Sequence, residues 1–148
     1  MDRARILIVD DHEIFRRGLR SLLESRDEFD ISGEAANGLE AVQMARELQP
    51  DIIVMDVSMP QMDGLQAARM IRRERPDSKI LILSQHDSPH MLAAALEAGA
   101  RAYVTKSQVA RCLFAALDAV AEGRGFSWNG IAASDGTGHP PSEPTGIE

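Results

Sequence analysis

Polar side chains that could take part in chemistry stand at the ends of short apolar runs. Asp10 and Asp11 follow "ILIV", Asp56 follows "IIVM" and Ser84 follows "ILIL". Lys106 follows the run "YVT". If these runs are neighbouring parallel strands, their carboxyl ends share one edge of the sheet, where open α/β folds place their sites. Three carboxylates, a hydroxyl and an ammonium group would then meet at that edge.

The chemistry that suits such a group is phosphoryl transfer. Clustered carboxylates raise one another's pKa unless a cation shares their site, and Mg²⁺ binds through carboxylates, water and phosphate oxygens. A carboxylate can also attack phosphorus and become an aspartyl-phosphate, provided that positive charge and hydrogen-bond donors surround the phosphoryl oxygens. Mg²⁺, Lys106 and Ser84 would supply these, so we expect Asp56 to be the phosphoacceptor.

Each of these residues also has an ordinary structural interpretation. Asp11 could cap the helix that follows it, Lys106 could be a solvated surface lysine, and Ser84 could be a satisfied loop hydroxyl. Their joint occurrence at successive strand ends favours a functional site.

The elements that must position these residues alternate between strand and helix patterns. Short apolar runs predict strands at residues 5–9, 30–35, 51–55, 79–83 and 101–104. Between and after them, apolar residues recur every three or four positions, which is typical of amphipathic helices. This alternation predicts an α/β domain with a parallel sheet and helices on both faces.

Composition is consistent with one domain and a tail. The 148 residues carry a net charge of −7, which argues against a strongly basic nucleic-acid surface. Cys112 is the only cysteine, and the first apolar run is too short for a signal peptide or a membrane span, so we expect a cytoplasmic protein. Residues 1–122 would form the domain, and the Gly/Pro/Ser-rich residues 123–148 a tail or truncated linker, largely disordered after about residue 133.

Four segments of the sequence together resemble the signature regions of a known family. "ILIVDDHEIFRRGLRSLLE", "PDIIVMDVSMPQMDG", "KILILS" and "GARAYVTKS" occur in the order found in receiver domains of two-component response regulators. The resemblance spans about residues 3 to 122. It implies a flavodoxin-like, doubly wound sheet of five parallel strands in the order 2-1-3-4-5, with helices on both faces.

The resemblance implies a magnesium-dependent phosphoacceptor site. Asp56 would accept a phosphoryl group from the phosphohistidine of a histidine kinase or a phosphotransfer protein. Asp11, Asp56 and the main-chain carbonyl of Ser58 would ligate Mg²⁺. Asp10 would act mainly through water, and Lys106 would pair with the phosphoryl oxygens.

The resemblance also implies a conformational switch. Ser84 would move toward the phosphate and Tyr103 would turn inward, which would reshape the surface of the fourth helix, fifth strand and fifth helix for a partner or for dimerisation. Ser58, Gln85 and His86 stand where the family tunes the lifetime of the phosphate. Because Gln85 is longer than the small residue usual there, we expect the lifetime of the phosphate to be altered, but the sequence does not predict whether it is longer or shorter.

Within the family, "VDDHEIFRRGL" and "AANGLEAV" most resemble the NarL/FixJ class, in which a DNA-binding helix-turn-helix domain normally follows and transcription is controlled. After Gly123 the sequence has no helical pattern of that kind. We therefore expect a stand-alone receiver or a chain cut before its output domain, with no DNA-binding domain and no membrane contact. Its catalysis would extend only to its own phosphotransfer and dephosphorylation.

Two other functions remain open at this point. An aspartate-nucleophile phosphohydrolase acting on small molecules would use related Mg²⁺ chemistry. Such enzymes usually carry a second aspartate two residues after the nucleophile, where this chain has Ser58. The domain could also serve as a phosphorylation-independent interaction domain, although all the matched site residues are present.

Overall fold

Strands rich in Ile, Leu and Val pair in parallel in the order β2-β1-β3-β4-β5-β6 in the computed structural model, which describes residues 3–85 and 88–128. The strands are β1 (Ala4–Val9), β2 (Phe29–Ala35), β3 (Ile52–Asp56), β4 (Lys79–Ser84), β5 (Ala102–Thr105) and β6 (Phe126–Trp128). Among the interior strands, β3 is buried throughout, and β1 and β4 are buried from Ile6 and Ile80 onward. Burial on both faces explains why their sequences are continuous apolar runs without alternation.

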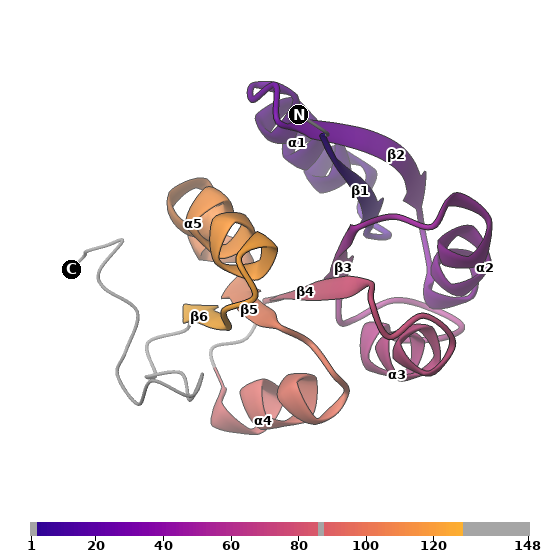
Figure 1. The fold of residues 1–148 in the computed structure, drawn as a ribbon. Coiled ribbons are helices and arrows are strands. Elements are labelled where there is room, and N and C mark those ends of the chain that lie inside the picture. The colour runs from indigo at the N-terminus through magenta and orange to yellow at the C-terminus, as the bar shows by residue number, and fades with distance from the viewer. Residues whose placement is uncertain (1–2, 86–87, 129–148) are drawn as a thin grey trace.

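Helices cover both faces of this sheet, as the sequence predicts (Figure 1). The helices are α1 (Glu13–Glu24), α2 (Gly38–Leu48), α3 (Gly64–Glu74), α4 (Pro89–Glu97) and α5 (Val109–Ala121), with a short 3₁₀ helix, η1 (Lys106–Gln108), before α5. One core lies between the sheet and α1 and α5, and the other between the sheet and α2, α3 and α4. None of the helices among the described residues is long and apolar enough to cross a membrane.

The prediction of five strands is corrected to six. Residues Phe126–Trp128, assigned from the sequence to the tail, pair in parallel with β5 as strand β6. The chain leaves α5 through Gly123, whose φ of 83° suits glycine, and the Phe126 amide donates a hydrogen bond to the Arg101 carbonyl at 3.1 Å. A three-residue strand is too short to show a periodic pattern, and it forms because the outer edge of β5 offers unpaired main-chain groups.

The tail as predicted from the sequence is only partly described. Its beginning follows the end of α5 and includes the strand β6, in which Ser127 is buried. Residues 129–148, including the segment expected to be disordered, lie outside the described residues.

Candidate functional site

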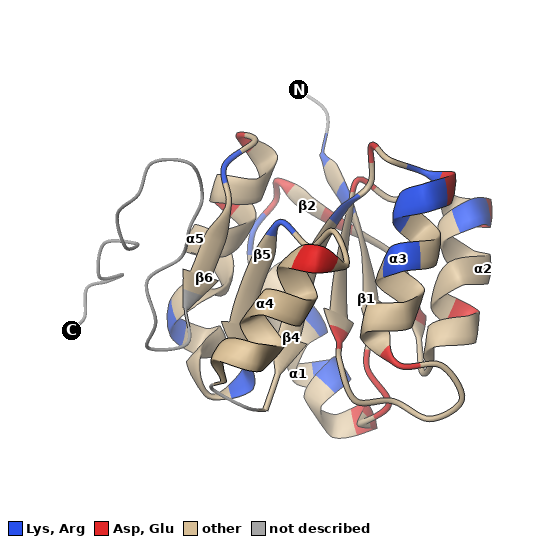
Figure 2. Ribbon diagram, turned by 90° about the horizontal axis from the view of Figure 1, so that it is seen from below, with Lys and Arg blue, Asp and Glu red and all other residues tan. Residues whose placement is uncertain are grey.

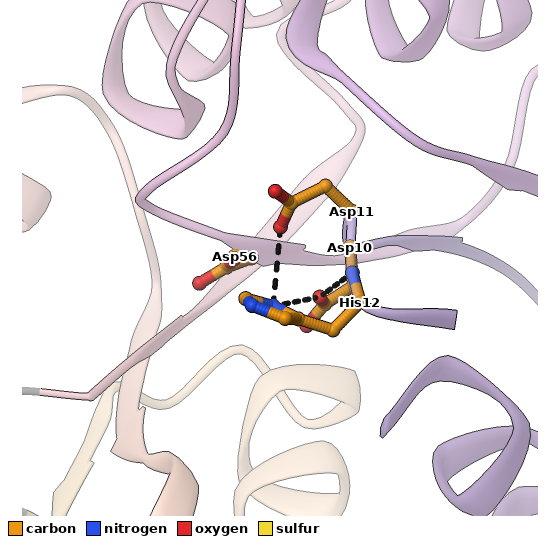
Figure 3. A group of neighbouring side chains, drawn as sticks. All are labelled: Asp10, Asp11, His12 and Asp56. Atoms are coloured by element: carbon orange, nitrogen blue, oxygen red, sulfur yellow. Dashed lines mark hydrogen bonds and ion pairs between the residues drawn. The ribbon is translucent and has the colours of Figure 1, made fainter. Parts of the chain in front are cut away.

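The carboxyl ends of β1 and β3 bring three aspartates together. Val9 pairs with Met55 in the parallel register, so the next residues, Asp10 and Asp56, lie side by side at the edge of the sheet. Carboxylate oxygens of Asp10, Asp11 and Asp56 lie within 4.8 Å of one another and of a ring nitrogen of His12 (Figure 3). Figure 2 shows acidic positions gathered at this end of the sheet, around the start of α1. We call these four residues together with Lys106 the carboxyl-edge cluster.

Lys106 brings the positive charge of this cluster from the residue after β5. Its Nζ lies 2.8 Å from Asp10 Oδ2 and 3.5 Å from Asp56 Oδ2. The side chain is only 11% exposed, and its ammonium group lies over the ring of Phe15, 4.4 Å from the centroid. Lys106 is therefore a mostly buried ion-pair partner of two aspartates, and the surface-lysine interpretation is wrong.

The negative charge of the Asp56 carboxylate is only partly compensated by its surroundings. Its burial, at 2% exposure, and the nearby charge of Asp10 raise the pKa of Asp56 to about 6, although Lys106 opposes the shift. Asp56 Oδ2 accepts no hydrogen bond from the described residues. A buried oxygen of this kind needs a partner, and a hard cation with oxygen ligands would provide one. The donor set of the cluster thus fits Mg²⁺.

His12 is a member of the cluster that the sequence analysis did not single out. Its main-chain amide donates a hydrogen bond to Asp10 Oδ1 at 2.8 Å. Its Nδ1 lies 3.3 Å from Asp10 Oδ1 and 3.2 Å from Asp11 Oδ1. His12 is also the N-cap residue of α1, so the alternative that Asp11 caps this helix is wrong. The signal available in the sequence was its place directly after the two aspartates.

The loop after β3 is folded tightly against Asp56. The Gly64 amide donates a hydrogen bond to the Val57 carbonyl at 2.8 Å, and a Cβ at position 64 would collide with the main-chain carbonyl of Asp56. Asp63 begins α3 with a capping box formed with Gln66. The Asp-Gly pair therefore holds the start of α3 against the end of β3, while Ser58, in the loop between them, is exposed.

Two of the remaining predicted residues, Ser84 and Tyr103, lie on the neighbouring strands β4 and β5. Ser84 is the last residue of β4, is 1% exposed and pairs in register with Thr105. Tyr103 is fully buried in the core beneath α4, so its ring already points inward in this structure. Gln85 is exposed directly after β4, and His86 lies outside the described residues.

Arg16 is a second residue that the sequence analysis missed. Its Nη1 donates a hydrogen bond of 2.6 Å to the main-chain carbonyl of Asp10, and its Nε donates one of 2.8 Å to Glu34 in β2. Burial opposes ionisation of Glu34, but the hydrogen bonds from Arg20 and Arg16 prevail and lower its pKa. Arg16 thereby ties α1 to the end of β1.

Comparisons with known proteins agree with this geometry. The family described as "Response regulator receiver domain" matches residues 6–118. The transcriptional regulatory protein YdfI of Bacillus subtilis (strain 168) is 44% identical over 119 residues, which is 80% of this chain and 55% of that protein. The transcriptional regulatory protein LiaR of the same organism is 40% identical over 119 residues, covering 80% of this chain and 56% of that protein. The chain thus spans about half the length of these curated relatives.

Solved structures show the same likeness over most of the chain. The crystal structure of a LuxR-family two-component response regulator from Aurantimonas sp. SI85-9A1 has a TM-score of 0.82 and 40% identity, covering 87% of this chain and 91% of that one. The signal receiver domain of the putative response regulator NarL from Mycobacterium tuberculosis has a TM-score of 0.79 and 31% identity, covering 84% and 100%. This chain therefore belongs to the family of receiver domains of two-component response regulators, with regulators of the NarL/LuxR family among its relatives.

Proposed function

We propose that this receiver domain takes a phosphoryl group onto Asp56 from the phosphohistidine of a histidine kinase or phosphotransfer protein. The observation that carries the proposal is the buried Asp56 Oδ2, which accepts no hydrogen bond from the described residues and has an ammonium group 3.5 Å away. Such an oxygen is available to a phosphorus atom, with positive charge already in place for the phosphoryl oxygens.

The transfer is a displacement at phosphorus. An oxygen of the ionised Asp56 carboxylate forms the new P–O bond, and the P–N bond to the donor imidazole breaks. The bonding pair returns to the imidazole nitrogen, which takes a proton from solvent. Lys106 pairs with the phosphoryl oxygens, and the Ser84 hydroxyl donates a hydrogen bond to one of them. Attack of water on phosphorus later restores the carboxylate, and this self-directed chemistry is the domain's only catalysis.

Asp11, Asp56 and the main-chain carbonyl of Ser58 would hold Mg²⁺, with Asp10 acting through water. The ion would neutralise charge on the phosphoryl oxygens and orient them. One carboxylate oxygen of each aspartate lies within 4.8 Å of those of the others, which supports this assignment.

The lifetime of the aspartyl-phosphate would depend on the residues that flank it. Ser58 and Gln85 are both exposed on loops that leave the cluster. Side chains in those places admit or exclude the attacking water. His86 belongs to the same proposal, from its place in the sequence.

The output surface would be formed by α4, β5 and α5. A phosphoryl group on Asp56 would draw Ser84 toward it and favour the inward position of the Tyr103 ring, which is the position seen here. The pairing of β6 with β5 adds a strand to this surface. A partner, or a second copy of the domain, would bind it in the cytoplasm, and transcriptional output would belong to the whole protein.

Intact mass tests the proposal directly. The chain is incubated with Mg²⁺ and acetyl phosphate, beside an Asp56→Asn variant, an Asp77→Asn control at an exposed turn, and a sample with a chelator. We expect one added phosphoryl group in the parent chain and in Asp77→Asn, and none in the other two samples. Phosphorylation of Asp56→Asn, or multiple turnover on small phosphate esters, would overturn the proposal.

A further inference from the structure

We propose that Phe15 is a positioning residue for Lys106: the face of its ring holds the ammonium group over Asp10 and Asp56. This inference rests on the function proposed above for the carboxyl-edge cluster. It concerns a residue of α1, outside the strand ends that supply the cluster itself.

The geometry is that of a cation–π contact. Lys106 Nζ lies 4.4 Å from the centroid of the Phe15 ring, within the distance of about 6 Å at which the negative face of an aromatic ring attracts a cation. The two carboxylates lie at 2.8 Å and 3.5 Å from the same nitrogen. The ammonium group is thus in contact with two anions and one ring, and the side chain is 11% exposed.

The ring itself is held in place. Phe15 is partly buried against the core that underlies α1 and α5. Arg16, the next residue, anchors this turn of α1 through its hydrogen bonds to the Asp10 carbonyl and to Glu34. The same strand end therefore fixes the position of both the acid cluster and the ring.

An aromatic ring is well suited to hold this lysine. A lysine side chain is flexible along its four-carbon stem, so an unsupported ammonium group samples many positions. A carboxylate in place of Phe15 would hold the lysine, but it would occupy an N–H donor and place a negative charge beside the incoming phosphoryl group. The ring attracts the cation while leaving the N–H donors for the phosphoryl oxygens. Phe15 therefore orders Lys106 without competing with the phosphoryl group.

The experiment varies the charge on the ring face while keeping its shape. The full chain is prepared with phenylalanine, 4-fluoro-, 3,5-difluoro- and pentafluorophenylalanine at position 15, since each fluorine weakens the negative face. Beryllofluoride serves as the phosphoryl mimic, and its affinity in the presence of Mg²⁺ is measured by fluorine NMR. Phosphorylation by acetyl phosphate is followed by intact mass in the same samples.

We expect a stepwise loss of beryllofluoride affinity across the series, reaching about tenfold for the pentafluoro ring, because a desolvated cation–π contact is worth roughly this factor. Phe15→Tyr should retain the parent affinity, and Phe15→Leu should lose as much as the pentafluoro ring. The matched control is Phe114, whose ring lies under Arg26 at 3.9 Å and stacks on Phe29. The same substitutions at Phe114 should leave beryllofluoride affinity unchanged.

A second measurement does not depend on phosphoryl binding. Urea unfolding of the fluorinated series is compared in the parent and in a Lys106→Met background, so that the coupling between ring and lysine is isolated. We expect each added fluorine to lower the free energy of unfolding in the parent. In the Lys106→Met background, the free energy of unfolding should show no such trend across the series.

The outcomes separate the two proposals. If the parent chain binds beryllofluoride and the fluorinated series shows no trend, the positioning role is overturned and the phosphoacceptor function stands. The same destabilisation in both backgrounds would also overturn it. If the parent neither binds beryllofluoride nor becomes phosphorylated while the unfolding cycle shows coupling, the contact stands and the proposed function fails.

Discussion

At the scale of single residues, Asp56 is buried, although the proposed phosphoryl transfer requires its carboxyl group to be ionised. Burial and the charge of Asp10 raise its pKa to about 6, and Lys106 compensates only in part. A carboxyl group in this position destabilises the folded state when it is charged, and it would be relieved by a cation or by a phosphoryl group with its counter-ion. The strain on this carboxylate is thus part of what makes it reactive.

This residue predicts how stability depends on pH. Because the pKa of Asp56 is about 6 in the folded chain against an ordinary 3.8, the folded state binds more protons than the unfolded state between these values. Stability from this group is therefore present below pH 4 and is lost as the pH rises through 6. Without Mg²⁺ at pH 7.5, Asp56→Asn should raise the free energy of unfolding by about 1–3 kcal/mol, and this gain should vanish near pH 4.

Urea denaturation of both proteins across this pH range measures the effect. The Asp77→Asn control removes a carboxylate from an exposed turn. Its free energy of unfolding should differ from that of the parent by the same amount at every pH. A gain for Asp56→Asn that does not change with pH would contradict the assignment of the shift to this carboxyl group.

At the scale of elements, the site depends on how β3 passes into α3. The start of α3 approaches the end of β3 so closely that position 64 has no room for a side chain. The obstacle is main-chain carbonyl, which cannot move aside as a flexible side chain could. The packing of α3 against β3 therefore also fixes the position of Asp56.

We expect Gly64→Ala to destabilise the fold by about 1–3 kcal/mol, since the added methyl group overpacks the contact, and to slow phosphorylation by acetyl phosphate. Thermal or urea unfolding and intact mass measure the two effects. Gly18→Ala is the matched control, because a Cβ at this exposed position of α1 would meet nothing within 4 Å. It should be neutral or stabilising, by up to about 1 kcal/mol, through the better helix propensity of alanine. Equal effects of the two substitutions would rule out the close approach as the cause.

At the scale of the whole molecule, two helical layers bury a sheet whose carboxyl edge carries the polar cluster. The two cores exclude water from the faces of the central strands. The cluster therefore lies against an apolar interior at the carboxyl edge of the sheet. The net charge of the cluster is negative, because three carboxylates stand against one lysine. Cation binding should therefore be linked to the stability of the entire fold.

Mg²⁺ should stabilise the folded chain by mass action. At a free concentration tenfold above the dissociation constant, the gain is about 1.4 kcal/mol, and a chelator should remove it. Differential scanning fluorimetry with increasing Mg²⁺ measures this in the parent chain and in Asp11→Asn, which we expect to respond weakly. Asp27→Asn, at an exposed position between α1 and β2, should respond as the parent does. A response that persists in full in Asp11→Asn would remove Asp11 from the ligand set.

The sequence by itself determined the alternation of strands and helices, the parallel sheet, and the edge at which Asp10, Asp11, Asp56 and Lys106 meet. These follow from local periodicity and from the rule that parallel strands share a carboxyl edge, so they can be read along the chain. Family membership followed from the same segments, and the matched family confirms it.

Only the tertiary structure decided the rest. β6 forms because it can pair with the outer edge of β5. A strand of three residues is too short for its sequence to show a pattern that predicts this pairing. Phe15 meets Lys106, and Arg16 meets Glu34, across separations in sequence that no local pattern can span. Tyr103 lies inward because packing beneath α4 accommodates its ring. Contacts between distant segments depend on the relative placement of whole elements, which hydrophobic periodicity does not specify.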